Sequence, residues 1–330
     1  MNTIPIITAE DCEHKLSWRK VMEAIAEGHK TECALIDDIL FQQKGNSLLS
    51  RAAWVAGQGI GVKTASIFPG NQHLEEPLPN INAIFTLFED KTGLPVAIID
   101  GAFLTKWKTA GDSVLGSYLL ARPDSHCLVI LGAGAVAESL IDAYSEIFPS
   151  LEKIIIWNRT WEKAQKIAER YTTTKLPVTA TKDLEQAIRS ADIVSSATMS
   201  SEPFINGDWV QPGTHIDLIG AFRPDMREAM DNLINKARIF VDTKETTLHD
   251  IGEMRIPLEQ GVITQGDILG DLYSLCNGAR ARKSREDITL FKNGGGAHLD
   301  VLTALYIYQT SQIIEDPEHF QLSFDTPWYH

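Results

Sequence analysis

The residues best placed to do chemistry follow an apolar run at Cys127–Leu131, where Gly132, Gly134 and Ala137 form a G-x-G-x-x-A pattern. A buried strand that turns in this way into a helix is typical of dinucleotide-binding sites, although glycine at such a corner also has a purely steric use. The first glycine permits the tight turn, the second lets the backbone approach a diphosphate, and the alanine allows close packing. Amides at the start of the helix would hold the phosphates. The expected cradle comprises Gly132, Ala133, Gly134, Ala135 and Val136.

A second strand candidate, Lys153–Trp157, ends in Asn158, Arg159 and Thr160. In dinucleotide-binding folds an acidic residue at this place accepts the ribose hydroxyls of NAD, whereas arginine accommodates the 2′-phosphate of NADP. No carboxylate stands at this strand end, and the planar fork of Arg159 suits a phosphate dianion. The sequence therefore favours NADPH and leaves NADH open. The same three residues are also compatible with a simple turn that caps the next helix.

Composition limits the classes of function. The chain has 330 residues and a formal net charge of −14, with 44% hydrophobic residues. This length predicts two domains. The acidic excess argues against binding to nucleic acid or to an anionic membrane, and no stretch approaches the roughly twenty apolar residues of a membrane span. Because the first residues lack a signal-peptide pattern, we expect a cytoplasmic protein. Four scattered cysteines and isolated histidines predict no disulfide and no metal site.

The order of elements predicts an α/β protein with a Rossmann-type, doubly wound parallel sheet and a second, mixed α/β domain. Residues 1–45 are expected to be mostly helical, residues 47–99 to form short β-rich runs, and residues 105–120 to form a helix. From residue 127 to 241 strands and helices alternate, which favours a parallel sheet covered on both faces. An apolar helix at 299–308 can return to the first domain. The expected division is residues 1–123 with 297–330, and residues 124–296.

Several sequence blocks resemble the ornithine cyclodeaminase/mu-crystallin family. In family order they are Leu49–Ala52, Gly59–Thr64 with Phe68–Asn71, Thr92–Pro95, Leu104–Ala110, Gly132–Ala137 and Gly220–Glu228. The resemblance implies a homodimer with a mixed α/β domain for substrate binding and dimerisation, and a Rossmann domain for NAD(P). It also implies one of three activities: ornithine cyclisation with loss of ammonia, alanine dehydrogenation, or reduction of a cyclic ketimine.

The resemblance extends to residues that would contact the substrate. Arg51 matches the family arginine that contacts the substrate carboxylate, and Lys63 matches the lysine beside the reacting centre. Partial desolvation would lower the pKa of Lys63 and suit it to donate a proton. Lys108 stands where most relatives have arginine, so the charge is kept and the bidentate fork is lost. A surface lysine is the alternative for both lysines. Thr109 is expected beside the nicotinamide.

Further cofactor contacts are expected at strand ends, because open α/β sheets bind ligands at their carboxyl edge. The glycine run before the last helix can close over the nicotinamide or serve as a hinge between domains. The expected contacts are Ala197, Thr198, Met199, Gly220 and Gly296.

Phe222 stands where ornithine cyclodeaminases have an aspartate that handles the substrate amine. A phenyl ring neither accepts a proton nor holds an ammonium group, so this block disfavours cyclodeamination and resembles the ketimine reductase branch. An apolar wall at Phe222 would suit the methylenes of a pyrroline ring. Asp225, Arg227 and Glu228 are also compatible with a set that caps the next helix.

The expected substrate is a small cyclic imino acid, and the expected reaction is NAD(P)H-dependent reduction of Δ1-pyrroline-2-carboxylate to L-proline. The six-membered homologue, Δ1-piperideine-2-carboxylate, would give L-pipecolate. Alanine dehydrogenase and ornithine cyclodeaminase activities stay open, as does non-catalytic, NADPH-dependent carriage of a small molecule. A role in hydroxyproline degradation and proline metabolism rests on analogy.

Overall fold

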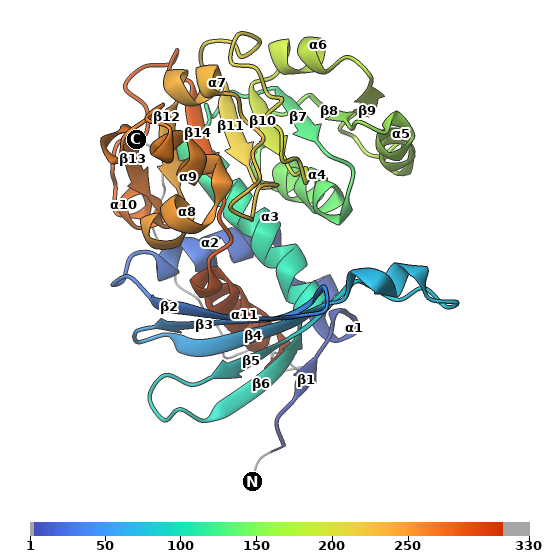
Figure 1. Ribbon diagram of the computed structural model, residues 1–330, viewed down its shortest axis with the longest axis vertical. Helices are drawn as coiled ribbons and strands as arrows, with labels where there is room; N and C mark the ends of the chain where they lie inside the picture. The colour runs from blue at the N-terminus through green and yellow to red at the C-terminus, as the bar shows by residue number, and fades with distance from the viewer. Residues whose placement is uncertain (1–2, 313–330) are drawn as a thin grey trace.

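The computed structural model describes residues 3–312, and the strands within this range form two sheets. One sheet has the order β1-β6-β5-β4-β3-β2, and the other has the order β13-β12-β14-β11-β10-β7-β8-β9. Helices α2, α3 and α11 (Trp18–Gly28, Gly101–Leu120 and Ala297–Gln312) lie between the two sheets (Figure 1). No helix of the described range is long and apolar enough to cross a membrane. The last dozen residues, whose polar and aromatic sequence is compatible with a tail or a dimer contact, lie outside the described residues.

The N-terminal sheet is antiparallel from β2 to β6, and β1 adds a parallel strand at one edge. Its second edge is β2, which was expected to be helical; that prediction is wrong. β2 is exposed along most of its length and has no buried face. Its sequence therefore lacks the alternation of apolar and polar residues that marks a half-buried strand. Pairing with β3 decides its structure, through a tight turn at Lys44 and Gly45 with φ of 50° and 82°. The elements are β1 (Ile6–Ile7), α1 (Ala9–Cys12), η1 (Glu13–Lys15), β2 (Leu35–Gln43), β3 (Asn46–Val55), β4 (Gly59–Ile67), η2 (Pro69–His73), β5 (Ile81–Phe88) and β6 (Pro95–Asp100).

The second sheet is parallel throughout, which confirms the predicted Rossmann-type fold. The chain runs from β7 outward to β8 and β9, then returns to β10 on the other side of β7, so the sheet has a switch point beside β7. Its elements are β7 (Cys127–Leu131), α4 (Ala135–Ile147), β8 (Lys153–Trp157), α5 (Trp161–Arg170), β9 (Val178–Thr181), α6 (Leu184–Arg189), β10 (Ile193–Ser196), β11 (His215–Leu218), α7 (Asp231–Lys236), β12 (Arg238–Val241), α8 (Lys244–Asp250), α9 (Gly252–Glu259), η3 (Gln265–Asp267), β13 (Ile268–Asp271), α10 (Leu272–Cys276) and β14 (Thr289–Lys292).

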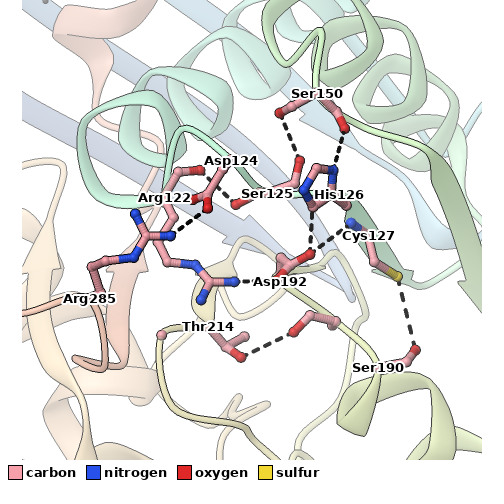
Figure 2. A network of polar contacts seen from close by, with 12 residues as sticks. Arg122, Asp124, Ser125, His126, Cys127, Ser150, Ser190, Asp192, Thr214 and Arg285 are labelled. Atoms are coloured by element: carbon pink, nitrogen blue, oxygen red, sulfur yellow. Dashed lines mark hydrogen bonds and ion pairs between the residues drawn. The ribbon is translucent and has the colours of Figure 1, made fainter.

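Polar contacts hold the segment that carries the chain from α3 into β7 (Figure 2). The Asp192 carboxylate accepts hydrogen bonds from the backbone amides of His126 and Cys127, at 2.8 and 3.0 Å, and pairs with Arg122. Asp124 in the same segment pairs with Arg285. These contacts lie at the amino-terminal end of β7. They do not occupy the carboxyl edge of the sheet, where open α/β sheets bind ligands.

Candidate active site

The turn after β7 leaves open space at the start of α4. Gly132 has φ of 114°, and a Cβ there would lie 2.6 Å from the carbonyl oxygen of Ala197, so this position requires glycine. A Cβ on Gly134 would meet no atom within 4 Å. Within residues 3–312 no side chain caps α4, so the amides of Ala135 and Val136 keep their hydrogen-bonding capacity. Ala133 is half-buried, and the turn thus has the room and the donors that a diphosphate requires.

The strand end at Asn158 exposes groups suited to a phosphate. The Asn158 amide donates a hydrogen bond to the carbonyl of Thr160 at 2.8 Å, which shapes the turn. Thr160 occupies the N-cap position of α5, but its hydroxyl makes no capping hydrogen bond. Arg159 is exposed and forms no ion pair within residues 3–312. The turn and the cap position are therefore present, while the guanidinium and the hydroxyl stay available to a ligand.

A buried glutamate organises the ends of β10 and β11. The Glu228 carboxylate accepts hydrogen bonds from the Ser196 hydroxyl at 2.6 Å, the Thr198 amide at 2.9 Å and the Gly220 amide at 2.7 Å. A Cβ on Gly220 would lie 1.7 Å from the Thr198 carbonyl oxygen. Burial raises the pKa of Glu228, and its hydrogen bonds oppose that rise. Two of the predicted cofactor residues, Thr198 and Gly220, are therefore locked together by one carboxylate.

The alternative in which Asp225, Arg227 and Glu228 cap the next helix is wrong, because α7 has no side-chain capping hydrogen bond within the described residues. Helix α7 begins at Asp231, with Met230 at its N-cap position. Asp225 is exposed and pairs with Arg223, whereas Glu228 is fully buried beneath the strand ends. The sequence motif could not show this, because a glutamate that caps a helix and one that ties two strand ends have the same local spacing.

Three cationic residues from separate elements lie near the loop that follows β14, and two of them are at Gly295 itself. Arg51 on β3 donates from Nη1 to the carbonyl oxygen of Gly295 at 3.1 Å. A Cβ on Gly295 would lie 3.0 Å from the Lys108 ammonium nitrogen. The third cation, Lys63, lies on β4 directly opposite Arg51 in the strand register. The structure therefore brings together the predicted residues Arg51, Lys63 and Lys108 beside the carboxyl edge of the second sheet.

Two carboxylates that the sequence analysis missed hold these cations. The Lys63 ammonium lies 2.8 Å from Oδ1 and 2.7 Å from Oδ2 of Asp300, which is fully buried in the first turn of α11. Only the contact with Oδ1 has hydrogen-bond geometry, so Oδ2 lacks a hydrogen-bond donor within the described residues. Asp38 on β2 accepts a hydrogen bond from Nε of Arg51 at 2.9 Å and forms an ion pair with its Nη2 at 2.9 Å. The sequence did not indicate the role of Asp38, because the segment that forms β2 was expected to be helical.

Lys108 is almost fully buried in the middle of α3, rather than near the start of a helix as expected. The helix begins at Gly101 because the Asp100 side chain accepts a hydrogen bond from the Phe103 amide at 2.7 Å. Burial lowers the pKa of Lys108 to about 8; the Asp300 carboxylate opposes this shift, and the other two cations add to it. Within residues 3–312 the Lys108 ammonium has no hydrogen-bond or ion-pair partner.

The glycine loop itself is tied to helix α3 and to the end of β12. The Asn293 amide donates to the carbonyl of Thr109 at 3.1 Å and to the Ser113 hydroxyl at 2.9 Å, both on α3. The Gly296 amide donates to Asp242, at the end of β12, at 3.2 Å. These bonds place the predicted residues Thr109 and Gly296 at the same junction as the cation cluster.

A histidine pair braces the start of α11. His29 Nδ1 lies 2.7 Å from the Ile25 carbonyl, which can only accept, so Nδ1 of His29 carries the hydrogen. Burial lowers the pKa of His29, so its neutral Nε2 accepts from Nε2 of His298 at 3.0 Å. The pair thereby joins α2 to α11 next to the glycine loop.

Two predicted residues lie at the surface. Met199 is 74% exposed and Phe222 is 56% exposed, on the segments that follow β10 and β11. The Phe222 ring lies beside the Arg223 guanidinium, 5.8 Å from the ring centroid. Ala197 is half-buried beside Gly132. The two large side chains therefore border the carboxyl edge without being packed into it.

Comparison with known proteins identifies the family. The model of the ornithine cyclodeaminase/mu-crystallin family matches residues 41–313. The Δ1-pyrroline-2-carboxylate reductase of Paracoccus denitrificans is 47% identical over 298 residues, covering 90% of this chain and 94% of that protein. The chain belongs to the ornithine cyclodeaminase/mu-crystallin family. This confirms the resemblance drawn from the sequence blocks.

Solved structures of similar proteins have the same fold. The structure of Thermococcus litoralis Δ1-pyrroline-2-carboxylate reductase in complex with NADH and L-proline has a TM-score of 0.85 and 28% identity. The match covers 93% of this chain and 97% of the Thermococcus litoralis chain. An archaeal alanine dehydrogenase dimer with bound NAD also has a TM-score of 0.85, with 26% identity and coverage of 93% and 96%. These two similar structures have one fold and are named for different reactions.

Proposed function

We propose that this protein is an NAD(P)H-dependent ketimine reductase that converts Δ1-pyrroline-2-carboxylate to L-proline and accepts the six-membered homologue Δ1-piperideine-2-carboxylate. The observation that carries the proposal is the hydrogen bond between Arg51 and Gly295, because it joins the cation cluster to the loop after β14. A relative at 47% identity has this activity. The nicotinamide, when bound, supplies a hydride to the imine carbon.

The substrate carboxylate would bind to Arg51 and Lys108. Hydrogen bonds to Asp38 and Gly295 use two of the five N–H groups of Arg51, on Nε and Nη1, so three remain for a carboxylate. The buried ammonium of Lys108 brings three further donors in a site that is largely shielded from water. Two cations around one carboxylate fix the ring orientation, which is the requirement for hydride delivery to one carbon.

Lys63 would supply the proton for the ring nitrogen. Its ammonium is held on Asp300 at 2.8 Å and is 12% exposed, so it is oriented and still accessible. The Asp300 carboxylate contacts the Lys63 ammonium through both oxygens and so holds the proton donor in place. The proton goes to nitrogen and the hydride to carbon, which completes the reduction of the C=N bond. Phe222 would form an apolar border for the ring methylenes.

The cofactor would lie along the carboxyl edge of the second sheet. The diphosphate would contact Gly134, Ala135 and Val136, where a Cβ on Gly134 meets open space. Arg159 supports the preference for NADPH, with NADH as the second cofactor. Ala197, Thr198, Met199, Gly220 and Gly296 would border the nicotinamide half. We assign residues 124–296 to NAD(P) binding, and residues 1–123 with 297–330 to substrate binding and dimerisation.

Replacement of Lys108 by arginine tests its role in carboxylate binding. The pKa of about 8 predicts that Lys108 is charged below that pH and neutral above it, so kcat/KM should fall as pH rises through about 8. Arginine stays protonated, so the Lys108→Arg protein should keep its activity to higher pH. The substrate is the same in both assays, and the difference between the two pH profiles therefore reports residue 108. Identical alkaline limbs would contradict this assignment.

We propose that a second copy of the chain covers the outer face of the N-terminal sheet. The strand register places six exposed apolar residues on the side opposite α11: Leu35, Ile39, Phe41, Leu48, Trp54 and Ile84. A hollow on this face is lined by Phe41, Leu48 and Phe68. Contiguous apolar surface of this kind marks an interaction site. A solved family member is described as a dimer.

Replacement of Ile39 by glutamate should convert the dimer to a monomer, because the interface would have to desolvate a carboxylate. Sedimentation velocity should then give half the mass found for the unmodified protein. Leu269→Glu is the matched control, since Leu269 is exposed on β13 in the other sheet. An unchanged mass in the Ile39→Glu protein would exclude this face as the interface.

The activity test is NADPH consumption with the two cyclic imines, compared with the Arg51→Ala protein. Turnover no faster than that of Arg51→Ala would reject the proposal. Strict dependence on added ammonia with an open-chain keto acid would assign alanine dehydrogenase activity, and ammonia release from ornithine would assign cyclodeaminase activity. Imine binding without product would assign a carrier. We place the reaction in the cytoplasm and in proline metabolism, where dehydration of a hydroxyproline would supply the imine.

A further inference from the structure

The ends of two neighbouring strands bring a second cation close to Arg159. Trp157 and Thr181 are the last residues of β8 and β9, and they are partners in the parallel register. The segments that follow them therefore leave the sheet side by side, about 4.8 Å apart. The Trp157 indole also donates to the carbonyl oxygen of Lys182 at 3.3 Å. This bond fixes the backbone of Lys182 beside the strand that leads to Arg159.

The side chain of Lys182 is directed toward the same helix start. Its ammonium lies 4.5 Å from the centroid of the Trp161 ring. Trp161 is the first residue of α5 and directly follows Arg159 and Thr160. A cation that rests on an aromatic face is held in place without losing its charge. Lys182 thus lies over the first side chain of α5, directly after the predicted phosphate-binding residues.

Both cations are available to a ligand. Lys182 and Arg159 are exposed, and neither forms an ion pair within the described part of the chain. The carboxylate adjacent in sequence, Asp183, caps α6 by accepting from the Gln186 amide at 2.9 Å. In a chain with a net charge of −14, two unpaired cations at neighbouring strand ends indicate a binding site for an anion.

We propose that Lys182 is the second cation, with Arg159, for the 2′-phosphate of NADPH and is therefore a determinant of cofactor specificity. This inference rests on the proposed NAD(P)H-dependent function and deepens it. A 2′-phosphate carries close to two negative charges near neutral pH, and a single guanidinium neutralises only one. Arg159 provides a directional fork, while Lys182 adds a point charge on a flexible stem. NADH lacks this phosphate, so its binding should not depend on Lys182.

The test compares binding of 2′,5′-ADP and 5′-AMP to the full chain by calorimetry. Lys182→Ala should weaken 2′,5′-ADP about tenfold, the loss of about one charge-assisted contact, and should change 5′-AMP less than about twofold. Lys182→Arg should restore the affinity for 2′,5′-ADP. Lys153→Ala is the matched control, because Lys153 is an exposed lysine at the opposite end of β8. Its affinities should equal those of the unmodified protein.

The possible results distinguish failure of the proposal for Lys182 from failure of the proposed function. Equal affinity of Lys182→Ala and the unmodified protein for 2′,5′-ADP would overturn the role of Lys182 and leave the proposed function intact. A parallel loss for 5′-AMP would also overturn it, since the effect would not depend on the 2′-phosphate. If the unmodified protein binds neither 2′,5′-ADP nor 5′-AMP, the proposed cofactor site itself fails.

Discussion

Replacement of Lys63 by methionine should lower kcat for Δ1-pyrroline-2-carboxylate by about 10³-fold, the range typical of lost general acid catalysis. Methionine is similar in length and carries no proton to donate. The imine nitrogen must be protonated as the hydride arrives, and Lys63 is the cation that a buried carboxylate holds in one orientation. KM should change less than kcat, because Arg51 and Lys108 bind the carboxylate. Steady-state kinetics with NADPH measures both constants.

The Lys63→Met protein has one complication, because Asp300 is left buried without its partner. Breaking a buried ion pair costs about 3–5 kcal/mol of stability. The double variant Lys63→Met/Asp300→Asn removes the buried charge and should recover most of the lost thermal stability without recovering turnover. Lys106→Ala is the control, since Lys106 pairs with Glu13 in an exposed position. A Lys63→Met protein within tenfold of normal kcat would exclude Lys63 as the proton donor.

Replacement of Gly134 by alanine should weaken NADPH binding by at least about tenfold while leaving the fold stable. The backbone of Gly134 has φ of −96°, which any residue adopts, and a Cβ there would meet no protein atom within 4 Å. The added methyl group would therefore collide only with a ligand that approaches the turn, such as the diphosphate. Fluorescence titration with NADPH and thermal unfolding measure the two effects separately.

Gly70→Ala is the matched control for this experiment. A Cβ on Gly70 also meets nothing within 4 Å, but Gly70 lies in η2, outside the second sheet. Neither variant should change the free energy of unfolding by more than about 0.5 kcal/mol. Normal NADPH affinity in the Gly134→Ala protein would show that the space above this turn is not where the diphosphate binds.

Local patterns were sufficient for the second sheet from β7 to β12, whereas β13 and β14 were not predicted. β7 is buried at all five positions, and the alternation of strands and helices after it follows the structure closely as far as β12. The glycine pattern at Gly132 has a steric cause that acts within a few residues, namely a positive φ and a close approach to Ala197. Features of this kind are visible in sequence because neighbouring residues determine them.

Long-range pairing decided what the patterns missed. β2 becomes a strand because it pairs with β3, although its own residues lack a buried face. Asp300 is separated from Lys63 by 237 positions along the chain, and Glu228 from Ser196 by 32. An aspartate in an apolar helix is visible in the sequence, but its partner is not, because burial and charge pairing depend on which elements pack together.

The amino-acid sequence by itself determined the Rossmann-type fold, the family, the dinucleotide turn and the three cationic residues, since each depends on residue type and short spacing. Tertiary structure alone decided that Arg51 and Lys108 lie at the Gly295 loop with Lys63 opposite Arg51 in the strand register, and that Asp38 and Asp300 hold two of these cations. It also decided the burial that lowers the pKa of Lys108. The physical reason is that desolvation and Coulomb interactions act through space, between elements that are distant in the chain.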